Sequence, residues 1–418
     1  MSPSVRGCPA RGDATPRHST HEVTMTSDQT LADREPVSSD QILANAIALG
    51  PFVRKNVEEI EGARTLTAPM VKAMHDAGIF RMSMPSAWGG PELDPLRQFE
   101  VIEALSVADG SVGWCAYINS TGGYFTSFLE ADVARAMYPS LDIPTGGQHT
   151  PVGRAEVVDG GYRINGRWTF GSGVKHSGWM ACGCIATRDG EPVLMEDGKP
   201  QRLSAFASAD QLDVIETWNS MGLRGTGSHD YTVTDLFVPT ERTFDLYSSP
   251  VLRTTPLFQL RTMFLFNHAA VALGIARNAV DSFAELTLSK RTNWGPMHEQ
   301  DYARSALARA DGVVRSARAY CMETLEDIYG TLTFGGELSV DQRAGFRLAI
   351  THAHRAAVEA VDGVFAAAGT TAAVRLPSVL ERCFRDVHVA NQHLIASPKS
   401  YSEIGGMLLG AVPDDPNY

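Results

Sequence analysis

Several patterns that mark common protein classes are absent from this chain of 418 residues. Its six cysteines form no C-x-x-C pair, and no segment concentrates Lys and Arg as a nucleic-acid-binding surface does. The formal net charge of −12 also disfavours contact with phosphate backbones. The scattered cysteines predict free thiols in a reducing cytoplasm, and nucleic acid is not an expected partner.

Motifs of the commonest cofactor and catalytic sites are missing too. The chain lacks G-x-G-x-x-G, G-x-x-x-x-G-K-[ST], H-E-x-x-H and G-x-S-x-G. His352 and His354 stand two apart on an expected helix, point to different faces and make a poor metal pair. No uninterrupted apolar stretch predicts a membrane span. We expect neither a metal nor a membrane partner, and a redox cofactor held outside a Rossmann fold stays open.

The N-terminal segment predicts a disordered tail over residues 1–37. It mixes Arg, Pro, Gly, Ser and His and has no apolar core of signal-peptide length. Whether Met1 or Met25 is the natural start stays open.

The remaining sequence changes its periodicity twice, which predicts an α+β chain of three domains. Residues 38–143 show helical spacing of apolar residues. Residues 144–247 alternate as antiparallel strands do, with hairpin turns expected at D-G-G (159–161) and N-G (165–166). Residues 248–418 return to long Ala-rich helical segments that predict a bundle.

Four segments resemble the acyl-CoA dehydrogenase superfamily, in the right order and at the right separations. They are WGGPELDPLRQFEVIEALSVADGSVGW (88–114), NGRWTFGSGVKHSGW (165–179), WNSMGLRGTGSHDYTVTDLFVP (218–239) and RCFRDVHVANQH (382–393). The chain is most similar to oxygenase components of two-component flavin monooxygenases, such as 4-hydroxyphenylacetate hydroxylase and the phenol hydroxylase of steroid breakdown. The resemblance implies an N-terminal helical domain, a middle antiparallel β domain and a C-terminal four-helix bundle, assembled as a homotetramer.

The carboxylate base of a working acyl-CoA dehydrogenase is missing. That family takes its base from the end of the RD helix or from the first long bundle helix. Residues 387–402 contain no Asp or Glu, and none lies between Asp245 and Asp281. Glu403 is a possible stand-in, but it follows the helix-closing Pro398. The empty positions favour a monooxygenase over a dehydrogenase.

The resemblance therefore implies a reduced-flavin-dependent hydroxylase of a phenolic or polycyclic aromatic substrate. Reduced FMN or FAD would come from a separate reductase, with O2 as co-substrate and a flavin hydroperoxide transferring OH. An N- or S-oxygenating enzyme of the same fold and an acyl-CoA dehydrogenase remain the alternatives.

Two residues are candidates for catalysis. By resemblance, His393 occupies the family's active-site histidine position, where an imidazole of near-neutral pKa suits deprotonation of a phenol. Ser172, in FGSG, falls where the monooxygenases place a serine against the flavin ring. The alternative for Ser172 is a hairpin serine that satisfies backbone groups.

The remaining candidates are assigned to the cofactor or the substrate by resemblance. The cofactor-binding candidates are His149, Trp168, Ser172, Thr226, Gly227, Ser228, Arg291, Gly369 and Thr370, the last three reaching a flavin from a neighbouring subunit. The substrate-binding candidates are Trp114, Tyr117 and Asn119. Core packing is the alternative for Trp168 and the substrate candidates, and a plain turn before the next strand is the alternative for G-T-G-S (225–228).

The RD helix carries expectations from spacing alone. Arg382 and Asp386, at i and i+4, are expected to pair and brace the helix. Asp386, Ala390 and His393 are expected on one face of that helix. His388 points elsewhere and is expected to be structural.

Overall fold

The computed structural model describes residues 38–370 and 377–411, which belong to one compact unit. The tail expected over residues 1–37, the choice between Met1 and Met25, and Cys8 lie outside the described residues. The other five cysteines are free and buried.

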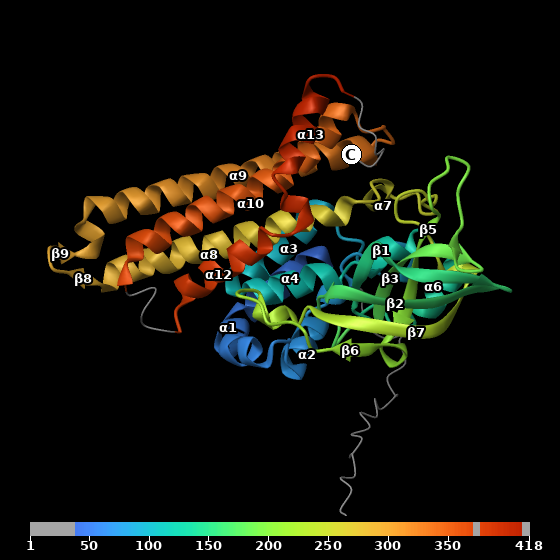
Figure 1. Cartoon of the computed structure of the whole chain (residues 1–418). Helices are drawn as coiled ribbons and strands as arrows, with labels where there is room; N and C mark the ends of the chain where they lie inside the picture. The colour runs from blue at the N-terminus through green and yellow to red at the C-terminus, as the bar shows by residue number, and fades with distance from the viewer. Residues whose placement is uncertain (1–37, 371–376, 412–418) are drawn as a thin grey trace, which may run out of the picture. The chain divides into compact units, whose positions relative to one another are not determined.

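The N-terminal part is helical, as its periodicity predicts (Figure 1). Ser38, Asp94 and Asp109 accept hydrogen bonds from backbone N–H groups in the first turns of α1, α3 and α4, which fixes where these helices begin. The elements are α1 (Ser39–Ala63), α2 (Ala68–Asp76), η1 (Ile79–Arg81), η2 (Ser86–Trp88), α3 (Pro95–Ala108), α4 (Gly110–Asn119), α5 (Gly122–Thr126) and α6 (Ala131–Met137).

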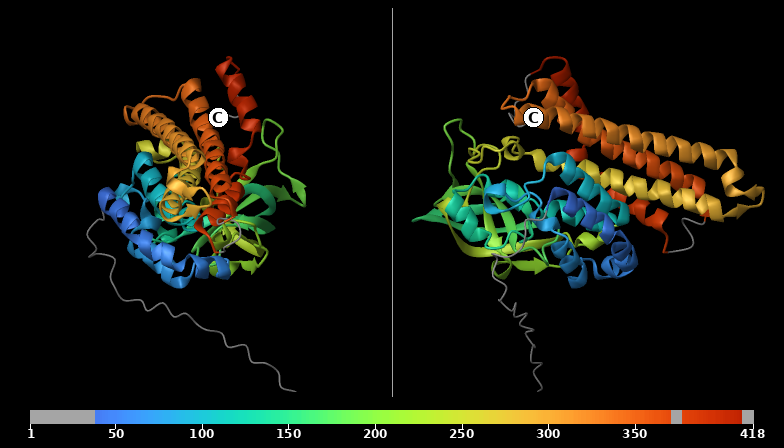
Figure 2. Two further views of the ribbon diagram at one scale, coloured as in Figure 1. Left: turned by 90° about the vertical axis from the view of Figure 1, so that its left-hand side faces the viewer. Right: turned by 180° about the vertical axis from the view of Figure 1, so that it is seen from behind.

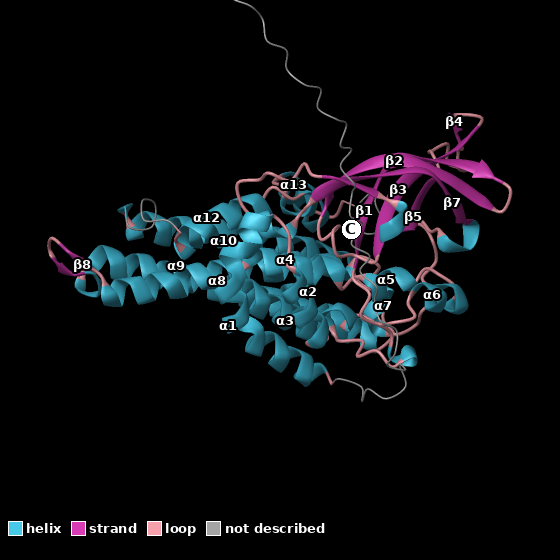
Figure 3. Ribbon diagram, turned by 90° about the horizontal axis from the view of Figure 1, so that it is seen from below, coloured by secondary structure: helices cyan, strands magenta, loops and turns pink. Residues whose placement is uncertain are grey.

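The middle part is a seven-stranded sheet whose strands run in the order β4-β3-β1-β2-β7-β6, with β5 paired to β3. The strands are β1 (Thr145–Val158), β2 (Gly161–Gly171), β3 (Trp179–Arg188), β4 (Glu191–Pro192), β5 (Arg202–Ser208), β6 (Asp213–Ile215) and β7 (His229–Pro239), with η3 (Ala209–Gln211), η4 (Arg224–Thr226) and η5 (Thr240–Arg242) in the connections. Figure 3 shows the sheet beside the helices. The expectation of antiparallel pairing is wrong for β1 and β3, which pair in parallel. Strand β2 returns the chain to the start of β1, and residues 172–178 cross to the other edge of β1 before β3 begins.

The two expected hairpin turns have different outcomes. Val158 pairs with Gly161, so Asp159 and Gly160 form the tight turn predicted at D-G-G. The N-G turn is wrong, because residues 165–166 lie inside β2, where its register with β7 shifts. A Cβ on Gly166 would lie 2.7 Å from the Trp168 ring, so this glycine makes room for an indole.

The C-terminal part is the predicted four-helix bundle of α8 (Asn267–Ser289), α9 (Asp301–Thr333), α10 (Val340–Ala368) and α12 (Val379–Ala390), which pack side by side in all views (Figures 1 and 2). The shorter elements are α7 (Pro256–Gln259), η6 (Met263–Phe266), β8 (Arg291–Thr292), β9 (Gly295–Pro296), η7 (Met297–Glu299), η8 (Leu394–Ala396) and α13 (Lys399–Leu408).

The bundle shares one hydrophobic core with the N-terminal helices, while the sheet has a smaller core of its own. The boundaries expected near 143 and 247 mark changes of secondary structure, but the two helical parts are not separately packed. Met263–Ser289 is the one described helix that is long and apolar enough to cross a membrane, and 83% of its most apolar window is buried inside the protein. That burial is typical of a core helix.

Candidate functional site

Ser172 lies in the turn between β2 and β3 and is 6% exposed. Phe170, two residues earlier, has φ 61°, a left-handed conformation that is costly for a bulky residue. This bend, together with a register shift between β2 and β7, ends the strand. Ser172 N–H donates to the Phe170 carbonyl at 2.9 Å. The strained turn therefore directs the serine into the protein interior.

A chain of hydrogen bonds links Ser172 to helix α4 and to the loop before β7. The Trp114 indole N–H donates to Ser172 Oγ at 3.0 Å, and Ser172 Oγ lies 2.8 Å from Ser228 Oγ. Ser228 Oγ lies 2.7 Å from Thr226 Oγ1, which donates to the Leu223 carbonyl at 2.8 Å. The structure thus brings four predicted site residues together, with Trp114 positioning the serine. Because the single Thr226 hydroxyl proton goes to the Leu223 carbonyl, Ser228 donates to Thr226 and Ser172 donates to Ser228.

The backbone of the G-T-G-S segment serves this turn. The backbone N–H groups of Gly225, Thr226 and Gly227 already donate to Ser111 Oγ and to carbonyls of the same loop. Thr226 is 1% exposed and Ser228 is 5% exposed. The turn interpretation therefore describes the backbone of these residues, and their expected role toward the cofactor stays a prediction.

His393 follows helix α12 and does not belong to it. The helix ends at Ala390, and His393 begins the 3₁₀ turn η8, where its Nδ1 accepts from Ile395 N–H at 3.3 Å. The expected shared helix face with Asp386 is therefore wrong. The exposed part of His393 lines an open pocket of about 300 Å³ that also involves Arg355 and Asn391.

A cluster of aromatic and imidazole rings surrounds His393. Its ring centroid lies 4.1 Å from that of His268 on α8 and 5.8 Å from that of Trp114. His268 in turn lies 4.8 Å from Tyr117 and 6.1 Å from His354 on α10. Of the substrate candidates, Trp114 is therefore packed against the candidate base His393 and Tyr117 against His268, although they are 8% and 1% exposed.

Burial keeps these imidazoles uncharged. It lowers the pKa of His393 to about 4, with the nearby positive charge of Arg347 adding to the effect. It also lowers the pKa of His354 to about 3 and that of His268 well below its ordinary value. The expectation of a near-neutral pKa for His393 is wrong in this conformation. His393 keeps an exposed edge, whereas His268 and His354 are 1% and 0% exposed. Because His393 Nδ1 accepts from Ile395 N–H, the proton of its neutral ring lies on Nε2, which acts as a donor.

His149, on β1, lies in a second aromatic group. Its ring centroid is 4.5 Å from Phe125 and 6.2 Å from Phe244, and its Nδ1 lies 2.8 Å from Ser204 Oγ. Its Nε2 is buried without a hydrogen-bond partner in the described part of the chain. Burial lowers the pKa of His149 to about 4. An unpartnered ring nitrogen beside phenylalanines is suited to a polar edge on an aromatic ligand.

Two predicted contacts belong to the core instead. Trp168 is 0% exposed, stacks on Tyr231 and donates its indole N–H to the Gly183 carbonyl at 2.8 Å. Asn119 is 0% exposed and binds Ser177 Oγ at 3.0 Å and His176 Nε2 at 3.0 Å. A ligand cannot touch side chains without accessible surface, so the core interpretation holds for both.

Arg291, Gly369 and Thr370 are exposed at the other end of the bundle (Figure 1). The ends of α8 and α10 meet there, since Lys290 Nζ donates to the Ala368 carbonyl at 2.8 Å. The chain does not bring these residues to Ser172 or His393. Their expected role toward a neighbouring subunit stays a prediction.

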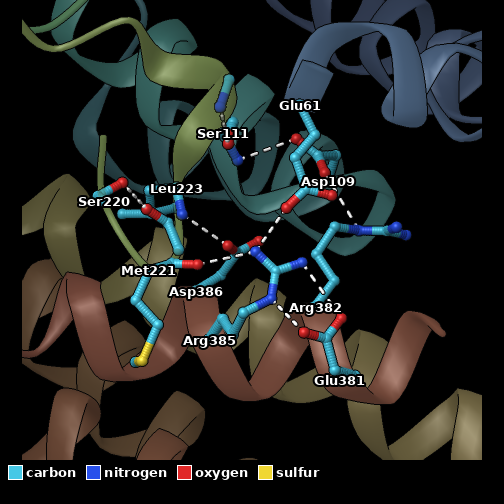
Figure 4. Close-up of polar contacts among 12 residues, drawn as sticks. Glu61, Asp109, Ser111, Ser220, Met221, Leu223, Glu381, Arg382, Arg385 and Asp386 are labelled. Carbon is cyan, nitrogen blue, oxygen red and sulfur yellow. Dashed lines mark hydrogen bonds and ion pairs between the residues drawn. The ribbon is translucent and has the colours of Figure 1, made fainter. Parts of the chain in front are cut away.

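The RD helix joins a buried polar network in place of the expected internal pair (Figure 4). Arg382 Nε lies 3.6 Å from Asp109 Oδ2, and Asp386 Oδ1 accepts from Leu223 N–H at 2.6 Å. The predicted Arg382–Asp386 pair is therefore wrong, because both side chains find partners on other elements. His388 Nε2 lies 2.9 Å from Asp362 Oδ1, which agrees with a structural role.

Sequence reasoning missed His268. The first bundle helix was searched only for carboxylates, and it carries a histidine in its first turn instead. The signal in the sequence was a histidine on the first long bundle helix, from which some acyl-CoA dehydrogenases take their catalytic base. His354 is buried and His352 exposed, as their predicted different faces require.

Comparison with known proteins matches both helical parts of the chain to one family. Residues 266–398 match the family Acyl-CoA dehydrogenase, C-terminal domain, and residues 50–131 match Acyl-CoA dehydrogenase, N-terminal domain. Indole-3-acetate monooxygenase of Pseudomonas putida is 31% identical over 383 residues, which cover 88% of this chain and 96% of that protein. The chain belongs to the acyl-CoA dehydrogenase superfamily and is a flavin-dependent monooxygenase.

Two further relatives of this monooxygenase agree. Flavin-dependent monooxygenase, oxygenase subunit HsaA, of Rhodococcus jostii is 28% identical, covering 84% of this chain and 94% of that protein. The crystal structure of 3-HSA hydroxylase from Rhodococcus sp. RHA1 superposes with a TM-score of 0.84 at 26% identity, covering 90% of this chain and 99% of that one.

The residues present in the monooxygenase fit its cofactor, reduced flavin. A flavin ring carries both hydrogen-bond donors and acceptors along its edge, and proteins tune it through bonds to those atoms. Ser172 Oγ donates its proton to Ser228 and keeps one acceptor lone pair beside the Trp114 N–H, and His149 Nε2 is buried without a partner in the described residues. Ser172 and His149 are therefore the residues that would hold the ring.

Proposed function

We propose that this monooxygenase, an oxygenase component, hydroxylates a phenolic or polycyclic aromatic substrate with reduced FMN or FAD from a separate reductase. The observation that carries the proposal is the contact of His393, after α12, with His268, on α8, at 4.1 Å between ring centroids; neither residues 387–402 nor residues 246–280 contain a carboxylate. The indole-3-acetate monooxygenase of Pseudomonas putida supports a fused aromatic substrate.

The side chains divide the work as follows. The bound cofactor activates O2 and supplies the oxygen atom that is transferred. His393 binds and orients a substrate hydroxyl: its Nδ1 accepts from Ile395 N–H, so the neutral ring carries its proton on Nε2, which donates to the hydroxyl oxygen. The rings around His149 and His268 form the apolar wall behind the site and exclude water from it. Ser172 holds the cofactor edge, and Trp114 fixes the direction of the serine hydroxyl.

The assembly and location are proposals as well. We propose a cytoplasmic homotetramer formed through the bundle, in which the Arg291 and Gly369 end of one chain reaches the flavin of another. The exposure of that end supports an intermolecular contact. Light scattering of the purified protein tests it, because a monomer at all concentrations would contradict the proposal.

The function is tested with reduced flavin, isotopically labelled O2 and a panel of phenols, indoles, an aromatic amine and a thioether. Mass spectrometry is expected to find one labelled oxygen atom on the ring of a phenol or indole. Labelled nitrogen or sulfur products alone would favour the N- or S-oxygenating alternative. Oxidation of an acyl-CoA without labelled product would overturn the monooxygenase proposal in favour of a dehydrogenase.

A further inference from the structure

A buried carboxyl group on α12 holds the loop that supplies two hydroxyls to Ser172. Asp386 is 4% exposed, and its Oδ1 accepts from Leu223 N–H at 2.6 Å (Figure 4). Leu223 has φ 50°, a left-handed conformation that leucine rarely adopts. The hydrogen bond to Asp386 therefore stabilises a backbone conformation that is unfavourable by itself.

Helix α12 also holds this loop at Met221 and Gly222, the two residues before Leu223. A Cβ on Gly222 would lie 2.2 Å from the Arg385 carbonyl oxygen, so the two backbones are in direct contact. Arg385 Nη1 donates to the Met221 carbonyl at 2.8 Å and lies 2.5 Å from Glu61 Oε1 on α1. The loop is thus held against α12 by its backbone and by an arginine that a second helix anchors.

Leu223 connects α12 to the hydroxyl groups near Ser172 through its two backbone polar groups. Its N–H donates to Asp386, and its carbonyl accepts from Thr226 Oγ1 at 2.8 Å. The Thr226 hydroxyl continues to Ser228 and then to Ser172 Oγ, at 2.7 Å and 2.8 Å. An unbroken chain of hydrogen bonds therefore runs from α12 to the serine.

We propose that Asp386 is a positioning residue: by holding Leu223, it sets the place of the Thr226 and Ser228 hydroxyls and so of the Ser172 hydroxyl. An effect of Asp386 on catalysis rests on the proposed function, in which Ser172 contacts the cofactor. The attachment of the loop itself does not depend on it.

The charges around Asp386 make the attachment depend on pH. Five other charged residues surround Asp386. They are Asp109 at the start of α4, Arg382 and Arg385 on α12, Glu61 on α1 and Arg224 on η4. Burial first, and the charge of Asp109 second, raise the pKa of Asp386 to about 7. A carboxylate accepts hydrogen bonds more strongly than its protonated form, so the loop is held more firmly above that pH.

Hydrogen exchange of the segment 219–228 tests the attachment, in protein without added flavin, at about pH 6 and about pH 8. Asp386→Leu is expected to accelerate exchange in this segment about tenfold, since it leaves a buried N–H without an acceptor. Asp386→Asn keeps a neutral acceptor and should exchange faster than wild type at about pH 8 but not at about pH 6. His388→Leu, a control on the same helix, should leave the segment unchanged.

Unchanged exchange in Asp386→Leu would overturn the proposal, as would equal acceleration in His388→Leu. If Asp386→Leu fails to fold, Asp386→Asn decides, because exchange equal to wild type at both pH values would also overturn it. The exchange result is independent of turnover. A wild-type protein that forms no hydroxylated product would refute the proposed function alone.

A double-mutant cycle tests the link to Ser172. Asp386→Asn is expected to lower kcat for hydroxylation about threefold in wild type and to have no further effect beside Ser172→Ala, because both changes act on one hydroxyl. Additive losses would show that Asp386 acts by another route and would overturn its positioning role.

Discussion

The residues assigned to the site lie in two regions with opposite environments. In the first, between α4, the turn after β2 and the end of α12, Trp114, Ser172 and Ser228 are buried and joined by hydrogen bonds. In the second, at the far ends of α8 and α10, Arg291 and Thr370 are exposed. In the first region the side chains are hydrogen-bonded to one another within a single chain, whereas in the second they are accessible only to another molecule. Changes in the first region should affect chemistry, and changes in the second should affect assembly.

Acidification is expected to have the largest effect, and it acts on the buried region. Burial lowers the pKa of His149 to about 4 and that of His354 to about 3, from an ordinary value of 6.5. Below pH 6.5 the unfolded chain binds more protons than the folded protein, so the stability present above pH 6.5 is lost as the pH falls. These two groups together remove about 4 kcal/mol by about pH 5, a large part of an ordinary domain's stability.

Urea unfolding followed by circular dichroism at about pH 7 and about pH 5 measures this loss. His354→Leu is expected to lose about 2 kcal/mol less stability on acidification than wild type, because one buried imidazole is gone while the others remain. His352→Leu changes an exposed ring and should behave as wild type does. The same loss in all three proteins would show that buried imidazoles are not the cause.

His393→Ala is expected to reduce hydroxylation about 100- to 1,000-fold, because it removes the imidazole that binds and orients the substrate hydroxyl. Binding of reduced flavin, measured by anaerobic titration, should change by less than about twofold, since the same change leaves Ser172 and His149 in place. His388→Ala is the control, because its partner Asp362 lies outside the pocket. Product formation equal to wild type would remove His393 from the mechanism.

His268→Phe is expected to reduce hydroxylation about tenfold. Phenylalanine keeps the ring contacts with Trp114 and Tyr117 but has no nitrogen, so packing and hydrogen bonding are separated. The melting temperature should be equal or higher, because a buried polar atom without a partner is removed. Full activity would mean that His268 only fills space beside His393.

The parts of the fold that could be predicted are those set by neighbours in sequence. Helical spacing predicted α8, α9 and α10, and Asp159-Gly160 predicted its hairpin. The parallel pairing of β1 and β3 depends on a connection that brings distant segments together, so no local pattern shows it. The Asn165-Gly166 pair was misread because Gly166 lies inside β2 and packs against β1, where a Cβ on Gly166 would lie 2.9 Å from the Gly153 Cα.

The site shows the same division. Ser172 and His393 could be found because the resemblance places them in short motifs. Their partners could not, since the bond from Trp114 to Ser172 and the contact of His268 with His393 join residues far apart in the chain. The pKa of His393 was also out of reach, because it depends on burial and on Arg347 from another helix.

Arg291→Met is expected to have the smallest effect and tests the exposed region. If this arginine reaches the flavin of a second chain, its loss should weaken reduced-flavin binding about threefold in the assembled protein, as a solvent-screened contact does. Arg188→Met, an exposed arginine at the end of β3, is the control. Anaerobic titration at a series of protein dilutions measures reduced-flavin binding of both variants. The difference in affinity between them should vanish when the assembly dissociates. A difference that persists in single chains would mean that the far end of the bundle is not completed by a partner, and the contrast between the two regions would fail.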